Sequence, residues 1–257
     1  MVGSSIKRSR EFIPRDAQSW ALVAILAALH IVLSVIPIFP FVTPFGAGSI
    51  AAAAITVPLF GILLGPILGP IAALIGGIIG SFLNPGASAL FLGFGFLPGV
   101  VGALVAGLLA QKRLYPFSAY LATVIYAVLV LGFLFFPPNK PFISFLIFLW
   151  FHLIILCALA VTVLLPPIRK RVLESEIPWV RVFFIALCGT MSDQMTGSFF
   201  FQAVSAPIIF GGYLPAEIWL IIAVLYPIER IIITIAATII GVVVIRALKD
   251  IGFAIAQ

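Results

Sequence analysis

The feature that most constrains this fold is the apolar stretch over residues 218–249, which carries two adjacent charges near its centre. A transmembrane helix needs about 20 predominantly apolar residues, so this stretch is long enough to cross a bilayer. At ~1.5 Å per residue, Arg230 lies roughly 18 Å from the start of the stretch, close to the midplane of a hydrocarbon core about 30 Å thick. Charges at that depth are costly and usually face a protein interior or a wet cavity. Glu229 and Arg230 therefore indicate either a functional site or an ion pair that locks two helices, and Pro227 predicts a kink beside them.

The composition extends this interpretation to the whole chain. Of 257 residues, 63% are hydrophobic and 9% are charged, whereas soluble domains are about 25% charged. We expect a basic cytoplasmic tail over residues 1–18 and a single transmembrane domain over residues 19–250. The net charge of +6 is concentrated in the termini and short loops, so it reports orientation in the membrane, and we expect no nucleic-acid partner. The spacing of Cys157 and Cys188 matches no metal or redox motif, so no metal site is expected.

The pattern of apolar runs and turn residues predicts an all-α, polytopic transmembrane bundle with about eight spans. The expected helices cover residues 19–38, 49–64, 67–83, 88–111, 117–136, 142–165, 182–202 and 218–249. The basic clusters then fall on one side, which predicts a multi-pass protein of the cell membrane with both termini in the cytoplasm. The turn between the second and third helices is short and uncharged, so one re-entrant element could replace both. The expected range is therefore six to eight spans.

Polar residues at mid-depth predict a binding cavity. Asp193 lies roughly 15 Å from the outer end of its helix, a depth similar to that of Arg230 on the next, antiparallel helix. We therefore predict that Asp193 pairs with Arg230. Glu229 is turned about 100° away on its helix and needs another partner. The expected substrate-binding residues are Asp193, Gln194, Glu229, Arg230, His30 and His152. The alternative is a buried polar network that only orders the bundle.

Several catalytic signatures are missing from the sequence. There is no GxxxxGK[ST] nucleotide loop, so the chain cannot hydrolyse ATP by that route. There is no HExxH and no GxSxG, so metalloprotease and serine hydrolase chemistry lack their residues. We expect a protein that is not an enzyme and that binds no cofactor directly.

Small residues form a strip on the first helix. Ala24 and Ala28 are one turn apart, and small residues at this spacing let another helix approach closely in lipid. Packing within the same chain is the alternative explanation of this strip.

Four stretches resemble the substrate-binding (S) component of energy-coupling factor (ECF) transporters, which take up vitamins and other micronutrients. They are ALVAILAALHIVLSVIP, LFGILLGPILGPIAALIGGIIGSFL, FLPGVVGALVAGLLAQKR and YPIERIIITIAATIIGVVVIRALK, and the polar segment MSDQMTG is also similar. The resemblance implies a helical bundle that binds its small-molecule substrate near the outer side. It also implies partners, namely a coupling (T) subunit and two ATPase subunits that use ATP. In the family an Ala-xxx-Ala strip contacts the T subunit, and here that strip maps onto Ala24 and Ala28.

Members of the family usually have six spans, whereas eight are expected here.

Two other hypotheses about the function remain open. A self-sufficient proton-coupled secondary transporter would instead use Asp193 or Glu229 as its proton carrier. A membrane-embedded enzyme would use Glu229 together with a histidine, although no recognisable catalytic motif supports it.

Overall fold

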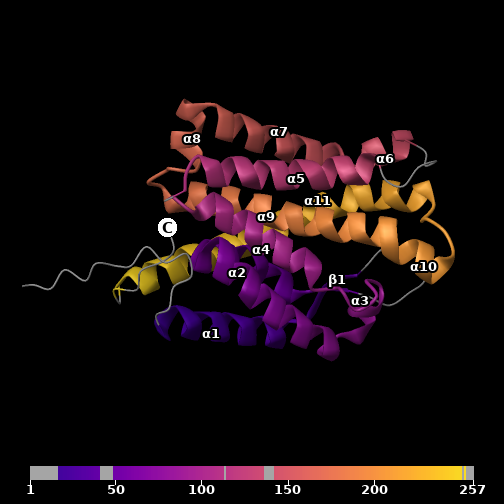
Figure 1. The fold of residues 1–257 in the computed structure, drawn as a ribbon, viewed down its shortest axis with the longest axis horizontal. Helices are drawn as coiled ribbons and strands as arrows, with labels where there is room; N and C mark the ends of the chain where they lie inside the picture. The colour runs from indigo at the N-terminus through magenta and orange to yellow at the C-terminus, as the bar shows by residue number, and fades with distance from the viewer. Residues whose placement is uncertain (1–16, 41–48, 113, 136–141, 251, 253–257) are drawn as a thin grey trace, which may run out of the picture.

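The computed structural model describes residues 17–40, 49–112, 114–135, 142–250 and 252, which excludes most of the expected tail over residues 1–18. The longer helices are α1 (Ala17–Leu33), α2 (Thr56–Leu83), α4 (Leu97–Ala110), α5 (Phe117–Phe135), α7 (Trp150–Leu164), α9 (Pro178–Phe200) and α11 (Ala216–Asp250). The shorter elements are β1 (Pro37–Pro40), β2 (Ser49–Ala51), the 3-10 helix η1 (Ala52–Ile55), α3 (Pro85–Ala89), α6 (Phe142–Phe148), α8 (Pro166–Val172), the π-helix η2 (Phe201–Ser205) and α10 (Ala206–Phe210). The longer helices lie roughly along one common axis, with α1 at one edge of the bundle and α7 at the other (Figure 1).

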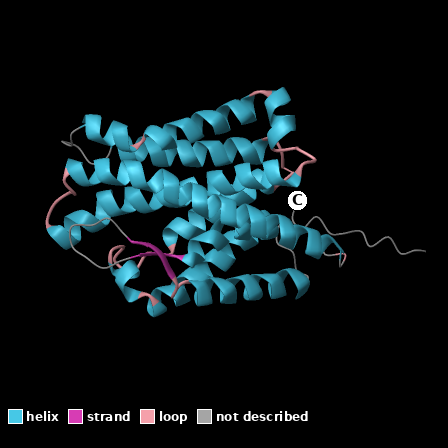
Figure 2. Ribbon diagram, turned by 180° about the vertical axis from the view of Figure 1, so that it is seen from behind, coloured by secondary structure: helices cyan, strands magenta, loops and turns pink. Residues whose placement is uncertain are grey.

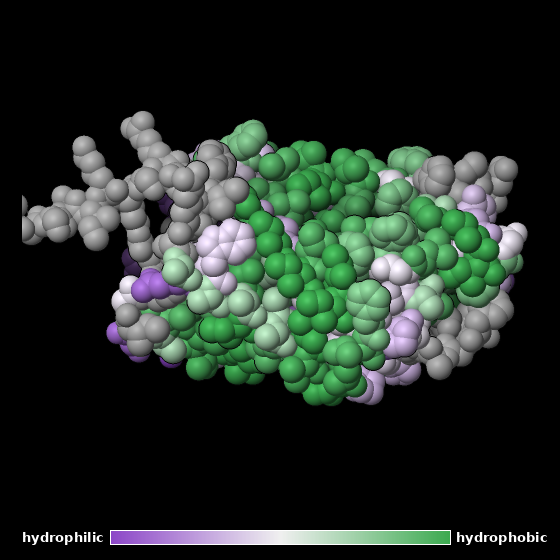
Figure 3. Space-filling view, turned by 60° about the horizontal axis from the view of Figure 1, so that its bottom comes forward, coloured by the Kyte–Doolittle hydropathy of each residue, from purple (hydrophilic) through white to green (hydrophobic). Residues whose placement is uncertain are grey.

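By length and apolar composition alone, three of the described helices could cross a membrane, although α2 turns back at Gly65. They are α2 together with η1, α5 and α11, and the bent pair of α6 and α7 makes a fourth if it forms one span. The helices α1 and α4 are apolar but shorter. Figure 3 shows apolar side chains across the middle of one face and more hydrophilic ones toward its ends. The helix lengths and this surface indicate a membrane protein.

The helix α2 folds back on itself at Gly65. A Cβ built on Gly69 would lie 2.8 Å from the carbonyl oxygen of Phe60. In a straight helix nine residues would separate these positions by about 13.5 Å. Gly65 has φ 81° and ψ −172°, a conformation that only glycine adopts readily, and Pro66 supplies no N–H to continue the helix. The predicted break between residues 64 and 67 is thus confirmed, although the first segment becomes α-helical at Thr56 and not at residue 49.

Two other predicted helices are wrong in part. The expected helix 88–111 is interrupted by Leu92 and Gly93, whose φ values of 53° and 86° are incompatible with a right-handed helix, and α4 begins at Leu97. The expected helix 142–165 is divided into α6 and α7, which are bent by 57° relative to each other.

A small antiparallel sheet of β1 and β2 departs from the all-α prediction. It pairs Phe39 with Ile50, where the sequence predicts a break between helices over residues 39–48 and a helix from residue 49. Prolines at both ends of β1 favour extended backbone, which explains why the chain is not helical there. Figure 2 shows the sheet toward the end of the bundle away from the last turns of α11.

Close backbone packing joins α2, α4 and α9. A Cβ on Gly61 would overlap the carbonyl oxygen of Ala103, and one on Gly102 would lie 2.8 Å from that of Gly189. Small residues allow this approach, which maximises van der Waals contact where lipid supplies no hydrophobic driving force. These three helices therefore pack tightly against one another, and α9 carries polar residues of the predicted site.

Basic side chains gather at the end of the bundle opposite the sheet. Lys112, Arg181 and Lys249 line one small recess there with a volume of about 150 Å³. The nearby charge of Arg181 is the main cause that lowers the pKa of Lys112, with burial second. The Arg169 guanidinium lies 5.1 Å from the centre of the Tyr115 ring, and burial raises the pKa of Tyr115 to about 12. One end of the molecule is therefore strongly positive.

Candidate functional site

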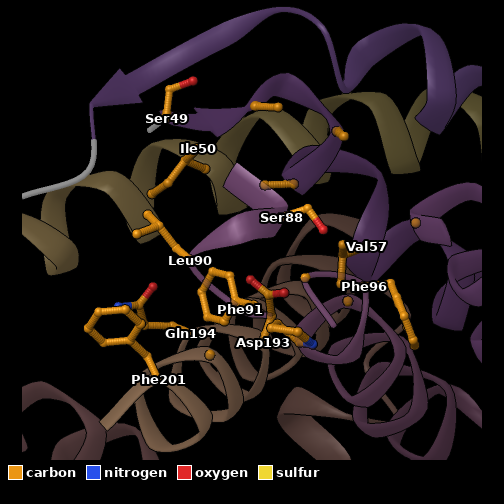
Figure 4. Close-up of a pocket in the computed structure, with 18 of the residues that line it drawn as sticks. Ser49, Ile50, Val57, Ser88, Leu90, Phe91, Phe96, Asp193, Gln194 and Phe201 are labelled. Carbon is orange, nitrogen blue, oxygen red and sulfur yellow. The ribbon is translucent and has the colours of Figure 1, made fainter. Parts of the chain in front are cut away.

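A cavity of about 280 Å³ lies among the helices toward the end that carries the sheet. Its wall combines residues of both strands with residues of α1, α2, α4, α9 and α11, and Figure 4 shows part of it. The cavity therefore depends on the return of α2 at Gly65 and on the break before α4, because both bring chain segments to its wall.

An ion pair joins α9 to α11 at the cavity. Arg230 Nη1 donates to Asp193 Oδ2 at 2.9 Å, and the side chains of Arg230 and Asp193 are 4% and 16% exposed. This confirms the predicted pairing of these residues. Arg230 Nε is buried and has no hydrogen-bond partner among the described residues. Asp193 offsets the charge of Arg230, while the buried Nε–H of the guanidinium makes no hydrogen bond within the described residues.

Glu229 lines the same cavity and has no partner among the described residues. It is half-buried, and within residues 17–40, 49–112, 114–135 and 142–250 no side chain or backbone group forms a hydrogen bond or ion pair with its carboxylate. It directly precedes Arg230 in α11, and adjacent helical positions do not share a face. Glu229 is thus the acid of the cavity that a ligand can engage directly.

His30 brings α1 into the cavity wall. Its Nδ1 lies 2.7 Å from Thr56 Oγ1, whose hydroxyl hydrogen is donated to the carbonyl oxygen of Ala53. The Thr56 oxygen must therefore accept from His30 Nδ1–H, which leaves Nε2 of the neutral ring as an acceptor. The ring also packs on Phe60, with centroids 5.4 Å apart.

Gln194 adds an amide next to the ion pair in sequence. It lines the cavity, and its Nε2 donates to Ser198 Oγ at 3.3 Å, one turn along α9. Figure 4 shows Asp193 and Gln194 with the rings of Phe91 and Phe201 in the same part of the cavity. The polar residues of α9 thus face an aromatic wall.

His152, the sixth predicted binding residue, does not line the cavity. It is buried behind Tyr226, and the two rings stack with centroids 5.0 Å apart and an interplanar angle of 15°. Its Nδ1 lies 2.8 Å from the Tyr126 hydroxyl. His152 lies at a depth in the bundle similar to that of the other polar residues. Its side chain, however, lies behind Tyr226 and packs on that ring instead of reaching the cavity.

The aromatic and small polar residues of the wall were not predicted from the sequence. The aromatic side chains are Phe91, Phe96, Phe201, Trp219 and Tyr226, and the small polar ones include Ser34, Ser49, Ser81, Asn84, Ser88 and Ser198. With 24 phenylalanines in the chain, none of these rings stood out in the sequence. The turn-forming Asn84-Pro85-Gly86 was the one signal that the chain bends near this wall.

The Ala24 and Ala28 strip lies on the outer surface of α1. Both residues are exposed, whereas the neighbouring positions Ala27 and His30 pack against Gly76 of α2. The strip therefore takes no part in the packing of α1 against the rest of the chain.

The described residues contain no group of three or more His, Cys, Asp or Glu side chains arranged to hold a metal ion. Comparison with protein families, with curated proteins and with solved structures found no match for this chain. The site must therefore be interpreted from its own geometry. That geometry is a recess that combines an acid–base pair, a second acid, a histidine and an aromatic wall, which suits reversible binding of a small polar molecule.

Proposed function

We propose that this chain is the substrate-binding membrane subunit of an ECF-type, ATP-driven importer of a vitamin or other small micronutrient. The observation that carries the proposal is the cavity among apolar helices, whose wall holds Asp193, Gln194, Glu229, Arg230 and His30. Ionisable residues inside an apolar bundle are expensive and usually mark the path or site of a polar ligand. The chain itself would bind without catalysis, and partner subunits would use the ATP.

The position of the cavity supports this role. It lies toward the sheet, at the end opposite Lys112, Arg181 and Lys249. Because basic residues concentrate on the cytoplasmic side of membrane proteins, the cavity end faces outward in a multi-pass chain of the cell membrane. A subunit that captures a scarce solute from outside needs its site on that side.

The exposed Ala24 and Ala28 strip supports the partner assignment. Two small residues one turn apart on a surface helix allow close approach by a helix of another protein. The coupling subunit would dock there, with two ATPase subunits bound to it on the cytoplasmic side.

Co-purification tests this proposal. The tagged full-length chain would be expressed with a coupling subunit and ATPases from the same genome, and compared with Ala24→Trp plus Ala28→Trp. The matched control is Val124→Trp plus Val128→Trp, an equally spaced exposed pair on α5. We expect the control to retain the complex and the alanine variant to lose it, because two indoles prevent close helix approach. No complex with the unmodified chain, where another S component assembles, would contradict the proposal.

The unpaired Glu229 supports a second candidate, a proton-coupled secondary transporter. A half-buried carboxylate in an apolar bundle can carry a proton between the two faces of the membrane. Reconstituted alone, such a transporter would accumulate its substrate under an imposed pH gradient. An importer subunit without its partners would not.

A further inference from the structure

We infer that the ligand of this cavity carries a positive charge, a protonated amine that binds Glu229, on a small apolar or aromatic body. This inference rests on the proposed small-molecule binding, and it names the chemistry of the ligand that the proposal leaves open.

The charges around the cavity do not balance. Its described ionisable residues are His30, Asp193, Glu229 and Arg230. Arg230 and Asp193 form a direct ion pair and offset each other. An ordinary imidazole is mostly neutral at pH 7, so His30 adds no full charge. Ionised Glu229 therefore leaves the cavity with one net negative charge.

Among the described residues of the cavity wall, Arg230 is the one Lys or Arg, and it already pairs with Asp193. Residues 41–48, which connect two strands of the wall, contain no ionisable side chain in the sequence. Lys112, Arg181 and Lys249 lie at the other end of the bundle. A cation brought by the ligand would offset an ionised Glu229 without protonating it.

The depth of Glu229 makes this imbalance costly. It lies roughly 20 Å along α11 from Ala216, since each helical residue adds ~1.5 Å. An unpaired carboxylate in an apolar surrounding loses much of its hydration without compensation. An ammonium group bound to it restores both the charge balance and charge-assisted hydrogen bonds, which are stronger than neutral ones.

The rest of the wall fits the body of such a ligand. The rings of Phe91, Phe96, Phe201 and Trp219 present apolar faces, which favour an apolar or planar group and also attract cations. The volume of about 280 Å³ is just below that of typical ligand pockets, which hold roughly 300–1,000 Å³. The ligand is therefore small.

An anionic ligand bound to Arg230 is the main alternative, and the charges disfavour it. The guanidinium already contacts Asp193 at 2.9 Å, and a second anion would bring three negative groups around one positive group. Like charges in such proximity repel strongly where water is scarce.

Calorimetry on the purified full-length chain, with three probes of one skeleton, tests the inference. The probes are 2-phenylethylamine as the cation, 2-phenylethanol as the neutral analogue and phenylalanine as the zwitterion. We expect the amine to bind the unmodified chain most tightly. Glu229→Gln keeps the shape and removes the charge, so it should weaken amine binding about 10- to 100-fold and leave the alcohol unaffected. The matched control is Glu217→Gln, which removes an exposed acid outside the cavity on the same helix and should change nothing.

Each other result would overturn the inference. These results are equal or tighter binding of the alcohol or zwitterion, no binding of the amine, and undiminished amine binding by Glu229→Gln. The test is independent of the importer proposal. Selective amine binding without a coupling complex would refute the importer proposal and support the cationic ligand. A coupling complex without a preference for the amine would support the importer proposal and refute the cationic ligand.

Discussion

Arg230 shows how one residue connects stability to the site. Its side chain is buried against Asp193, and the two helices that carry these residues pack directly on each other. Taking two charges out of water is costly, and their mutual attraction compensates only while both are present. The loss of either partner should therefore be worse than the loss of both.

The first prediction compares Arg230→Met, Asp193→Asn and the double variant. Arg230→Met should lower the free energy of unfolding by up to about 3–5 kcal/mol, because it leaves the Asp193 carboxylate without its partner. Hydration of Asp193 by water in the cavity reduces this loss. The double variant should be more stable than Arg230→Met alone, because no charge is left unpaired. Unfolding in detergent measures all three, and simple additivity of the two single changes would show that the pair does not couple.

For a single residue, the position along its helix was predictable from the sequence, whereas the direction in which its side chain points was not. Asp193 and Arg230 were matched by counting residues along two consecutive antiparallel helices, which needs only the rise per residue. His152 has a similar depth, yet it stacks on the far side of Tyr226. Which way α7 turns depends on contacts with other helices, which residue counting does not contain.

Among the elements, α2 shows how a glycine decides the architecture. The return at Gly65 makes one apolar stretch into two adjacent segments, and Gly107 of α4 packs on the turn with a built Cβ only 2.6 Å from the Gly65 carbonyl carbon. The sequence signalled the break through its glycines and prolines. It did not show that the two segments would lie against each other.

The second prediction concerns Gly65→Ala. The φ of 81° is strained for any residue with a Cβ, so the free energy of unfolding should fall by roughly 1–3 kcal/mol. The matched control is Gly212→Ala, where φ is not positive and no atom lies within 4 Å of a built Cβ. Thermal unfolding in detergent should leave that control within about 0.5 kcal/mol of the unmodified chain. Equal effects of the two changes would mean that the turn at Gly65 is not needed.

In the whole molecule, the cluster of basic side chains and the polar cavity lie toward opposite ends. The basic recess of Lys112, Arg181 and Lys249 lies at one end and the polar cavity opens toward the other. The lowered pKa of Lys112 follows mainly from the charge of Arg181, so positive charges are held together there in spite of their repulsion. An anionic membrane surface on the cytoplasmic side favours such a concentration.

The third prediction follows from this polarity and concerns orientation in the cell. A membrane-impermeant maleimide should label Tyr213→Cys in intact cells, and Glu176→Cys only after permeabilisation. Both positions are exposed. Tyr213 follows α10 and Glu176 follows α8, and these two helices lie at opposite ends of the bundle (Figure 1). The background is Cys157→Ser, since Cys157 is exposed and Cys188 is buried. Labelling of both positions from the same side would contradict the orientation.

The sequence by itself determined the apolar helical character, the placement of most helices, the break near Gly65 and the pairing of Asp193 with Arg230. Each of these depends on local composition or on distance along a helix, which the sequence contains directly. Tertiary structure alone decided that His30 shares a cavity with Glu229 and that His152 does not. It also decided the small sheet and the aromatic wall around Phe91. The reason is that facing and cavity shape come from how helices pack against one another, and that packing depends on contacts between segments far apart in the chain.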